Sequence, residues 1–160
     1  MGIAERLSAA DVILALGATT KQDVLQFLAA EAGKRLDRPK GEILQALQAR
    51  EQLGSTALGR GVALPHAQLE GNSRPVALFA RLLRPVDYEA RDEEPVDLVI
   101  LVLWPRESPA GFLPALADTC RALREPQVLR RLRAAQTPDD VIGLLSGPPS
   151  SGNGTPSEAA

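Results

Sequence analysis

Residues 96–104 read VDLVILVLW, and this run constrains the fold more than any other part of the chain. A run of aliphatic and β-branched residues of this length suits a β-strand that is covered on both faces by helices. Hydrophobic residues make up 44% of the chain but aromatic residues only 3%, so Leu, Val, Ile and Ala must fill most of a core. The run therefore predicts the central strand of an α/β domain.

Strand and helix patterns alternate around this run. Strands are predicted at residues 7–16, 57–58, 62–64, 76–83 and 96–104. Helices are predicted from apolar spacing and start signals at residues 21–36, 40–53, 109–123, 126–132 and 138–145. We therefore expect one α/β domain over residues 1–147, with a central mixed β-sheet of about five strands flanked by helices on both faces. Residues 148–160 are rich in Pro, Gly and Ser and are predicted to form a disordered tail.

Local patterns add detail to three of these segments. Thr20 is a candidate N-cap, and Asp23 three residues later makes a near capping box. The charged stretch YEARDEE, residues 88–94, is expected to lie in solvent between two strands. The helix at residues 109–123 is expected to bury the apolar positions Leu113, Leu116, Ala117, Cys120 and Leu123.

Charge and composition exclude several classes of function. The formal net charge is −2 without a long basic run, so nucleic acid is not an expected partner, and the Arg-rich residues 121–133 are interpreted as a solvated helix face. Cys120 is the only cysteine, so neither an internal disulfide nor a cysteine-based metal site is expected. No apolar run approaches the roughly 20 residues of a membrane span, and no export signal is visible. We expect a cytoplasmic protein without direct membrane insertion.

The chemistry of the chain is concentrated in residues 49–71, AREQLGSTALGRGVALPHAQLEG. Arg50 ends a predicted helix, Ser55 and Thr56 follow it, and a Gly-X-Gly turn leads to the end of a second short strand, where His66 is expected. Arginine and hydroxyl side chains can bind phosphoryl oxygens. A histidine near its ordinary pKa of about 6.5 is substantially neutral at pH 7 and can attack phosphorus without a separate base.

Each residue also has an ordinary structural interpretation. A lone histidine after a proline is commonly a surface loop residue, Arg50 can interact with the helix dipole, and Ser55 and Thr56 can be turn residues. With no second histidine in the chain, His66 does not build an ordinary zinc site. The chemistry of these residues by itself leaves a functional and a structural His66 evenly balanced.

The order R-E, G-S-T, G-X-G and then apolar-A-apolar-P-H resembles the active-site signature of fructose and mannitol type enzyme IIA domains of the bacterial phosphotransferase system. Within that family, the chain is most similar to the nitrogen-regulatory IIA proteins. PVDLVILVLWP resembles the family's central strand, and VLRRLRAAQTPDDV resembles its final helices. The resemblance covers roughly residues 7–145.

The resemblance implies a role for each matching position. It makes His66 the phosphorylated histidine, Arg50 a residue that helps to hold the phosphoryl group, and Ser55 and Thr56 the adjacent hydroxyl pair. Glu51 matches the signature without an evident role. The family commonly has a second histidine at the start of the helix after the central strand, and Phe112 stands at that position here.

The implied function is that of a phosphotransferase-type phosphocarrier that needs no cofactor. An HPr-like carrier would phosphorylate His66, and the domain would regulate target proteins by its phosphorylation state. Two alternatives are a sugar-transport IIA domain that passes phosphate to a IIB partner, and an interaction module that has lost transfer activity. Leu58, Val62 and Leu64 could form an apolar docking rim, although buried strand positions are the favoured interpretation.

Overall fold

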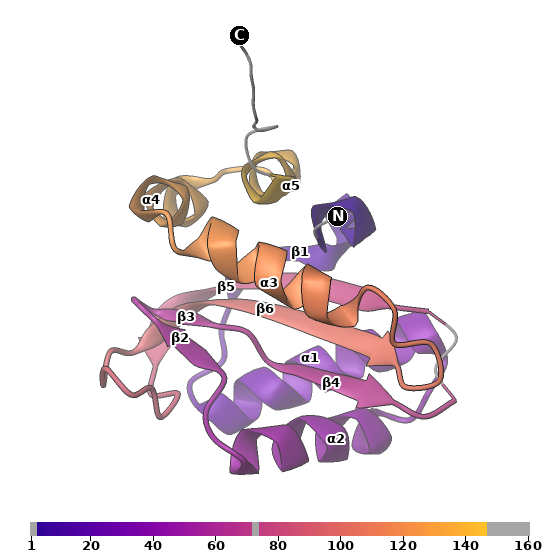
Figure 1. The fold of residues 1–160 in the computed structure, drawn as a ribbon. Helices are drawn as coiled ribbons and strands as arrows, with labels where there is room; N and C mark the ends of the chain where they lie inside the picture. Colours follow the sequence, from indigo (N-terminus) through magenta and orange to yellow (C-terminus); the bar gives the residue numbers. More distant parts are fainter. Residues whose placement is uncertain (1–2, 72–73, 147–160) are drawn as a thin grey trace, which may run out of the picture.

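The computed structural model describes residues 3–71 and 74–146 (Figure 1). Its strands are β1 (Val12–Leu16), β2 (Ala57–Gly59), β3 (Val62–Ala63), β4 (His66–Leu69), β5 (Val76–Val86) and β6 (Val96–Pro105). Its α-helices are α1 (Lys21–Leu36), α2 (Lys40–Gln52), α3 (Phe112–Leu123), α4 (Pro126–Ala134) and α5 (Pro138–Ser146), and two short 3₁₀ helices are η1 (Ile3–Arg6) and η2 (Ala9–Asp11). The predicted tail, residues 148–160, lies outside the described residues.

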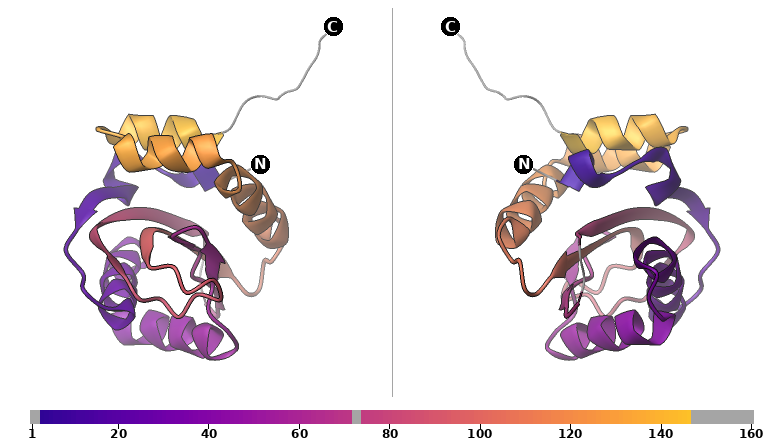
Figure 2. Two further views of the ribbon diagram at one scale, coloured as in Figure 1. Left: turned by 90° about the vertical axis from the view of Figure 1, so that its left-hand side faces the viewer. Right: turned by 90° about the vertical axis from the view of Figure 1, so that its right-hand side faces the viewer.

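The strands form one six-stranded mixed sheet in the order β1-β5-β6-β3-β2, with β4 also paired to β6. Strand β6 runs antiparallel to β5 and parallel to β3 and β4, so it is the central strand that residues 96–104 predict. Helices α1 and α2 cover one face, and η1, α3, α4 and α5 cover the other (Figures 1 and 2). The predicted α/β sandwich of a mixed sheet between helices is confirmed.

Alternate side chains of β6 enter two separate cores. Val99, Leu101 and Leu103 pack with α1 and α2. Ile100 and Val102 pack on the opposite side, with the N-terminal segment and the last three helices. Period-two alternation in a strand that is apolar on both sides explains why the run carries almost no polar residues.

Threonine side chains cap the starts of two helices, including the predicted Thr20 cap of α1 (Lys21–Leu36). The Thr20 hydroxyl accepts a hydrogen bond from the Asp23 amide at 3.0 Å at the start of α1. The Thr137 hydroxyl accepts one from the Asp140 amide at 3.1 Å before α5. Each of these bonds satisfies a backbone donor that has no partner within the helix.

Two strand boundaries differ from the prediction. Strand β1 starts at Val12 rather than at residue 7, because Ile3, Ala4 and Leu7 are buried in the helical layer instead of extending the sheet. Strand β5 continues through Pro85 to Val86. The register between β5 and β6 shifts between Arg81 and Val86, and an irregular ladder tolerates a residue without an N–H group.

The buried face of α3 also differs from the prediction. The helix starts at Phe112 after Gly111, whose φ of 92° favours glycine, and it buries Phe112, Ala115, Thr119 and Leu123. Thr119 can be buried because its hydroxyl donates to the Ala115 carbonyl at 2.7 Å. Among the positions predicted to be buried, Leu123 is buried, and Leu116 and Cys120 are partly buried against the core. Leu113 is 71% exposed and Ala117 is also exposed, because this rotation turns both away from the sheet.

Within residues 3–71 and 74–146, no helix combines the length and apolar character needed to cross a bilayer.

Candidate functional site

His66 is the first residue of β4, not the last residue of the preceding strand as predicted. Strand β3 ends at Ala63, and Leu64 and Pro65 interrupt the strand because proline has no amide hydrogen to donate. Pairing with β6 resumes at His66, which lies opposite Val102. The interruption therefore places a half-buried imidazole where a new strand begins, beside the central strand of the sheet.

The two nitrogens of the imidazole have different partners. Nδ1 lies 2.8 Å from the Leu64 carbonyl oxygen, which can only accept, so Nδ1 carries the proton. The Nε of Arg50 donates to Nε2 of His66 at 3.3 Å. Arg50 is itself held by its Nη1, which donates to the Gly54 carbonyl at 2.9 Å. The neutral ring thus presents its lone pair at Nε2, next to a guanidinium group.

The surroundings favour the neutral imidazole. Burial lowers the pKa of His66 below its ordinary value of 6.5, the hydrogen bond to Leu64 raises it, the Arg50 charge lowers it and the Glu51 charge raises it. The net effect is a lowered pKa, so the imidazole is neutral at neutral pH and its Nε2 is unprotonated. A neutral imidazole is the nucleophilic form.

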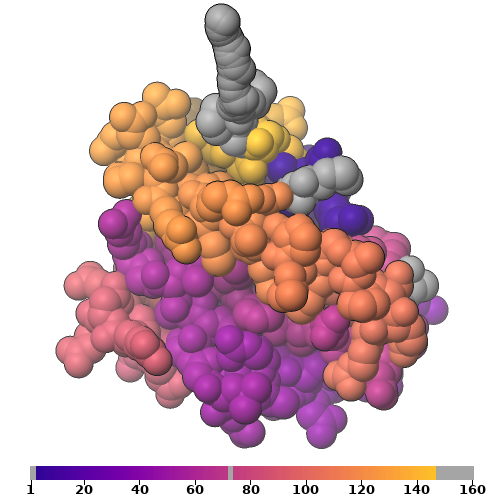
Figure 3. Space-filling model, in the orientation of Figure 1, coloured from indigo at the N-terminus to yellow at the C-terminus, as the bar shows by residue number. Residues whose placement is uncertain are grey.

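An aromatic wall borders the imidazole on the side of α3. The ring centroids of His66 and Phe112 are 6.1 Å apart, and those of Phe112 and Trp104 are 5.8 Å apart. The Arg6 guanidinium lies 4.8 Å from the centroid of the Trp104 ring. In Figure 3, the orange surface of the segment leading into α3 borders the magenta surface of residues 57–69. Phe112, which stands where the resemblance implies a second histidine, therefore contributes an apolar contact rather than a donor.

Ser55 and Thr56 lie in the segment that joins α2 to β2, and each has a protein partner. The Ser55 hydroxyl donates to the Tyr88 carbonyl at 2.8 Å and accepts from the Ala57 amide at 3.2 Å. Thr56 is 4% exposed and donates through its hydroxyl to the Glu51 carboxylate. These bonds hold the segment that carries the Gly54 carbonyl to which Arg50 is bound.

The prediction that residues 88–94 lie in solvent is wrong for Tyr88. Its side chain is fully buried, and its hydroxyl donates to Oε2 of Glu51 at 3.3 Å. Burial, with the nearby Glu51 charge, raises the pKa of the phenol above its ordinary value. The Lys21 ammonium lies 4.6 Å from the ring centroid. Tyr88 sits in a run of charged residues without apolar periodicity, so no local signal marks it as core.

Two exposed leucines flank the site, next in sequence to residues that belong to it. Leu53 is 84% exposed and precedes Gly54, and Leu113 follows Phe112. Of the three residues considered for a docking rim, Val62 and Leu64 are core, as favoured, whereas Leu58 is 44% exposed.

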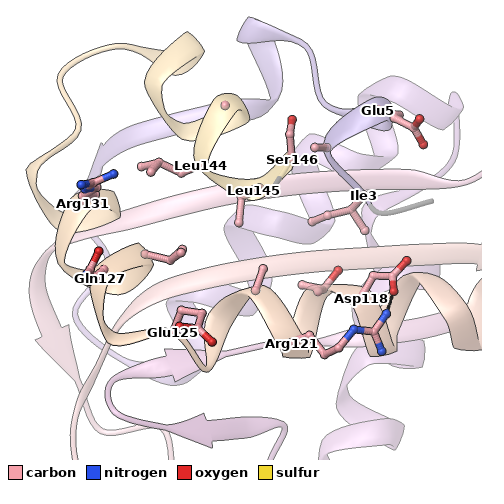
Figure 4. Close-up of a pocket in the computed structure, with 15 residues that line it drawn as sticks. Ile3, Glu5, Asp118, Arg121, Glu125, Gln127, Arg131, Leu144, Leu145 and Ser146 are labelled. Atoms are coloured by element: carbon pink, nitrogen blue, oxygen red, sulfur yellow. Dashed lines mark ion pairs between the residues drawn. The ribbon is translucent and has the colours of Figure 1, made fainter. Parts of the chain in front are cut away.

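A pocket of about 1080 Å³ lies in the helical layer that the N-terminal segment forms with helices α3, α4 and α5 (Figure 4). Its charged lining residues are of both signs, and Arg121 and Asp118 form an ion pair there. Its lining includes neither His66 nor Arg50. In residues 3–71 and 74–146, no group of three His, Cys, Asp or Glu side chains is arranged to hold a metal ion.

The fold is that of an enzyme IIA domain of the phosphotransferase system. Residues 5–147 match the family described as phosphoenolpyruvate-dependent sugar phosphotransferase system, EIIA 2. The chain belongs to this family, which confirms the resemblance seen in the sequence.

Within this family, the chain is similar to nitrogen regulatory proteins and shares its fold with a mannitol enzyme IIA. A nitrogen regulatory protein of Bradyrhizobium diazoefficiens is 38% identical over 149 residues, which cover 93% of this chain and 97% of the relative. The crystal structure of nitrogen regulatory protein IIA-Ntr from Neisseria meningitidis superimposes with a TM-score of 0.86 at 26% identity, covering 89% of this chain and 98% of that one. The structure of Escherichia coli enzyme IIAMTL in complex with phosphorylated enzyme IIBMTL shares the fold, with a TM-score of 0.72 at 22% identity, covering 88% of this chain and 97% of that one.

Proposed function

We propose that this protein is a cytoplasmic phosphocarrier of the nitrogen-regulatory branch of the phosphotransferase system. It accepts a phosphoryl group on His66 from an HPr-like carrier and regulates target proteins by its phosphorylation state. The observation that carries this proposal is that the two imidazole nitrogens have different partners. Nδ1 is bound to the Leu64 carbonyl, and Nε2 lies beside Arg50. The likeness to nitrogen regulatory proteins over nearly the whole chain supports the regulatory branch.

In the transfer step, the lone pair on Nε2 of His66 forms a bond to phosphorus while the bond between phosphorus and the carrier's donor atom breaks. The ring keeps its Nδ1 proton and gains positive charge, which the Leu64 carbonyl stabilises through the existing hydrogen bond. The Nε of Arg50, which donates to Nε2 in the free protein, donates instead to a phosphoryl oxygen, to which a guanidinium is well matched. Catalysis comes from positioning and charge stabilisation, as in other phosphoryl transfers.

Ser55 and Thr56 are proposed as support residues of this step. Their hydroxyls fasten the segment between α2 and β2 to the Tyr88 carbonyl and to Glu51. That segment includes the Gly54 carbonyl, which holds the Arg50 guanidinium. Through this contact they help to keep Arg50 next to the reacting nitrogen.

A second candidate function is transfer of the phosphoryl group to a IIB partner in sugar transport. The fold shared with mannitol enzyme IIA, which forms a complex with phosphorylated enzyme IIB, favours this candidate. A third is an interaction module without transfer activity, favoured by Phe112 at the position of the family's second histidine.

The decisive experiment incubates the protein with phosphoenolpyruvate, enzyme I and the HPr-type carrier of its own organism. Intact mass should increase by one acid-labile phosphoryl group in the wild type and not in His66→Ala. A wild type that takes up no phosphate would support the interaction module and contradict the proposal, and label retained by His66→Ala would move the site elsewhere. Onward transfer of the label to a IIB domain would identify the transport role.

A further inference from the structure

Glu51 is the residue of the signature that the transfer step leaves without a role. It follows Arg50 on the last turn of α2, and its side chain is only 6% exposed. Its Oε1 lies 3.0 Å from the Lys21 ammonium and accepts from the Thr56 amide at 3.0 Å. Its Oε2 accepts from the hydroxyls of Thr56 and Tyr88. One buried carboxylate thus joins α1, α2, the start of β2 and the segment after β5.

This network is a specific arrangement rather than a general source of stability. A buried ion pair offsets the cost of removing two charges from water only when further hydrogen bonds complete it. Here three donors besides the Lys21 ammonium face the carboxylate, so both oxygens are fully used. Such a group determines where its partners lie more than it adds free energy of folding.

Two series of contacts connect Glu51 with His66, one to each ring nitrogen. On the Nδ1 side, Glu51 holds Thr56, the Thr56 carbonyl accepts from the Leu64 amide at 3.0 Å, and the Leu64 carbonyl is the partner of Nδ1. On the Nε2 side, Glu51 anchors the helix turn from which the neighbouring Arg50 extends to Nε2. The same carboxylate is therefore connected to the partners of both ring nitrogens.

We propose that Glu51 is a positioning residue for phosphoryl transfer, which keeps His66 in the tautomer with a free Nε2 by fixing Leu64 through Thr56 and by fixing Arg50 through α2. This inference rests on the function proposed above. Glu51 does not touch the phosphoryl group or the carrier, because its carboxylate is buried and fully paired. Its loss therefore affects the chemical step and not the encounter with the carrier.

The test compares the intact chain with Glu51→Gln and Glu89→Gln. Glutamine is similar in size but offers one acceptor oxygen in place of two, and its NH₂ group faces donors. Glu89→Gln is the matched control, because Glu89 also pairs with Lys21, at 3.1 Å, but its side chain is 75% exposed. Circular dichroism and thermal unfolding establish that each variant is folded.

Two readouts distinguish positioning from a purely structural role. In Glu51→Gln, the rate of phosphoryl uptake at saturating carrier should fall about tenfold, with KM for the carrier changed less than about twofold, since small misplacements of reacting groups have effects of this order or larger. Imidazole ¹⁵N NMR should show the single Nδ1–H tautomer of the wild type replaced by a mixture. Glu89→Gln should match the wild type in both measurements.

A folded Glu51→Gln protein with the wild-type rate and a single tautomer would overturn the proposal. Tyr88→Phe removes only one donor to Oε2 of Glu51. This variant tests the positioning role of Glu51 if Glu51→Gln does not fold. It should show the same change in tautomer to a smaller extent, and an unchanged tautomer would contradict the proposal. If the wild type itself takes up no phosphate, the proposed function fails, whereas the NMR comparison still tests the effect of Glu51 on the imidazole.

Discussion

At the scale of single residues, a backbone carbonyl orients the imidazole of His66, the proposed phosphoryl acceptor. The Leu64 oxygen accepts from Nδ1, so the lone pair is at Nε2, without a carboxylate in direct contact with the ring. A neutral acceptor orients the ring and leaves its pKa below 6.5, because burial dominates. The sequence motif identifies His66 as a candidate, but the assignment of Nε2 as the proposed acceptor nitrogen depends on the position of the Leu64 carbonyl in space.

This lowered pKa predicts a pH dependence of stability. The folded state binds the His66 proton more weakly than the unfolded chain, so stability rises with pH where the unfolded state holds more protons. The contribution is complete above pH 6.5 and is lost as the pH falls from 6.5 through the lower folded-state pKa. Urea unfolding at successive pH values should show this loss in the wild type and not in His66→Asn, whose amide can donate to the same carbonyl.

The carboxylates act in a different range of pH. Asp11 and Glu31 have pKa values lowered from 3.8 and 4.5, so their contribution to stability is lost only at more acidic pH. Equal slopes for the wild type and His66→Asn between pH 6.5 and the acid range would contradict the assignment to His66.

At the scale of elements, the start of α3 controls the surface beside the site. Apolar spacing predicts the helix but not its rotation, because Leu113 and Ala117 are as compatible with the core as Phe112 and Ala115 are. Packing of Phe112 between His66 and Trp104 decides between the two faces and leaves Leu113 in solvent.

Because Leu113 is exposed beside the site, we expect it to contact the HPr-type carrier during docking. Leu113→Glu should raise KM for the HPr-type carrier about tenfold, because burying a new charge in an interface is costly, with the stability changed by less than about 0.5 kcal/mol. Steady-state phosphotransfer assays measure KM, and direct phosphorylation by phosphoramidate, which needs no docking, should be unchanged.

A matched control for Leu113 is Leu83→Glu. Leu83 is 67% exposed on β5, six residues from Ala77, which pairs with the residue opposite His66, or about 20 Å along the strand. An equal rise in KM in both variants would show a general effect of charge and contradict a docking role for Leu113.

At the scale of the whole molecule, Arg81 joins the sheet to the helical layer. From β5, its Nε donates to the Leu14 carbonyl at 3.1 Å, and its Nη1 donates to the carbonyls of Leu132 and Ala135 at 3.0 and 2.8 Å. One side chain thus satisfies backbone acceptors in β1 and at the end of α4.

Arg81→Met should therefore lower the free energy of unfolding by about 2 to 3 kcal/mol, because it leaves partly buried carbonyls without donors. The exposed Arg84 on the same strand is the control, and Arg84→Met should change stability by less than about 0.5 kcal/mol. Urea denaturation of both variants measures the difference, and a loss of similar size in both would exclude the proposed role of Arg81.

The sequence by itself determined the features that depend on near neighbours. These features are the two-sided apolar alternation in β6, the Thr20 cap and the Gly-X-Gly turn between β2 and β3. Each involves residues within a few positions of one another, so it can be predicted from the sequence. The tertiary structure alone decided the burial of Tyr88, the exposure of Leu113 and the partners of Glu51. Tyr88 and Glu51 are 37 residues apart, and such contacts depend on how whole elements pack rather than on local propensity.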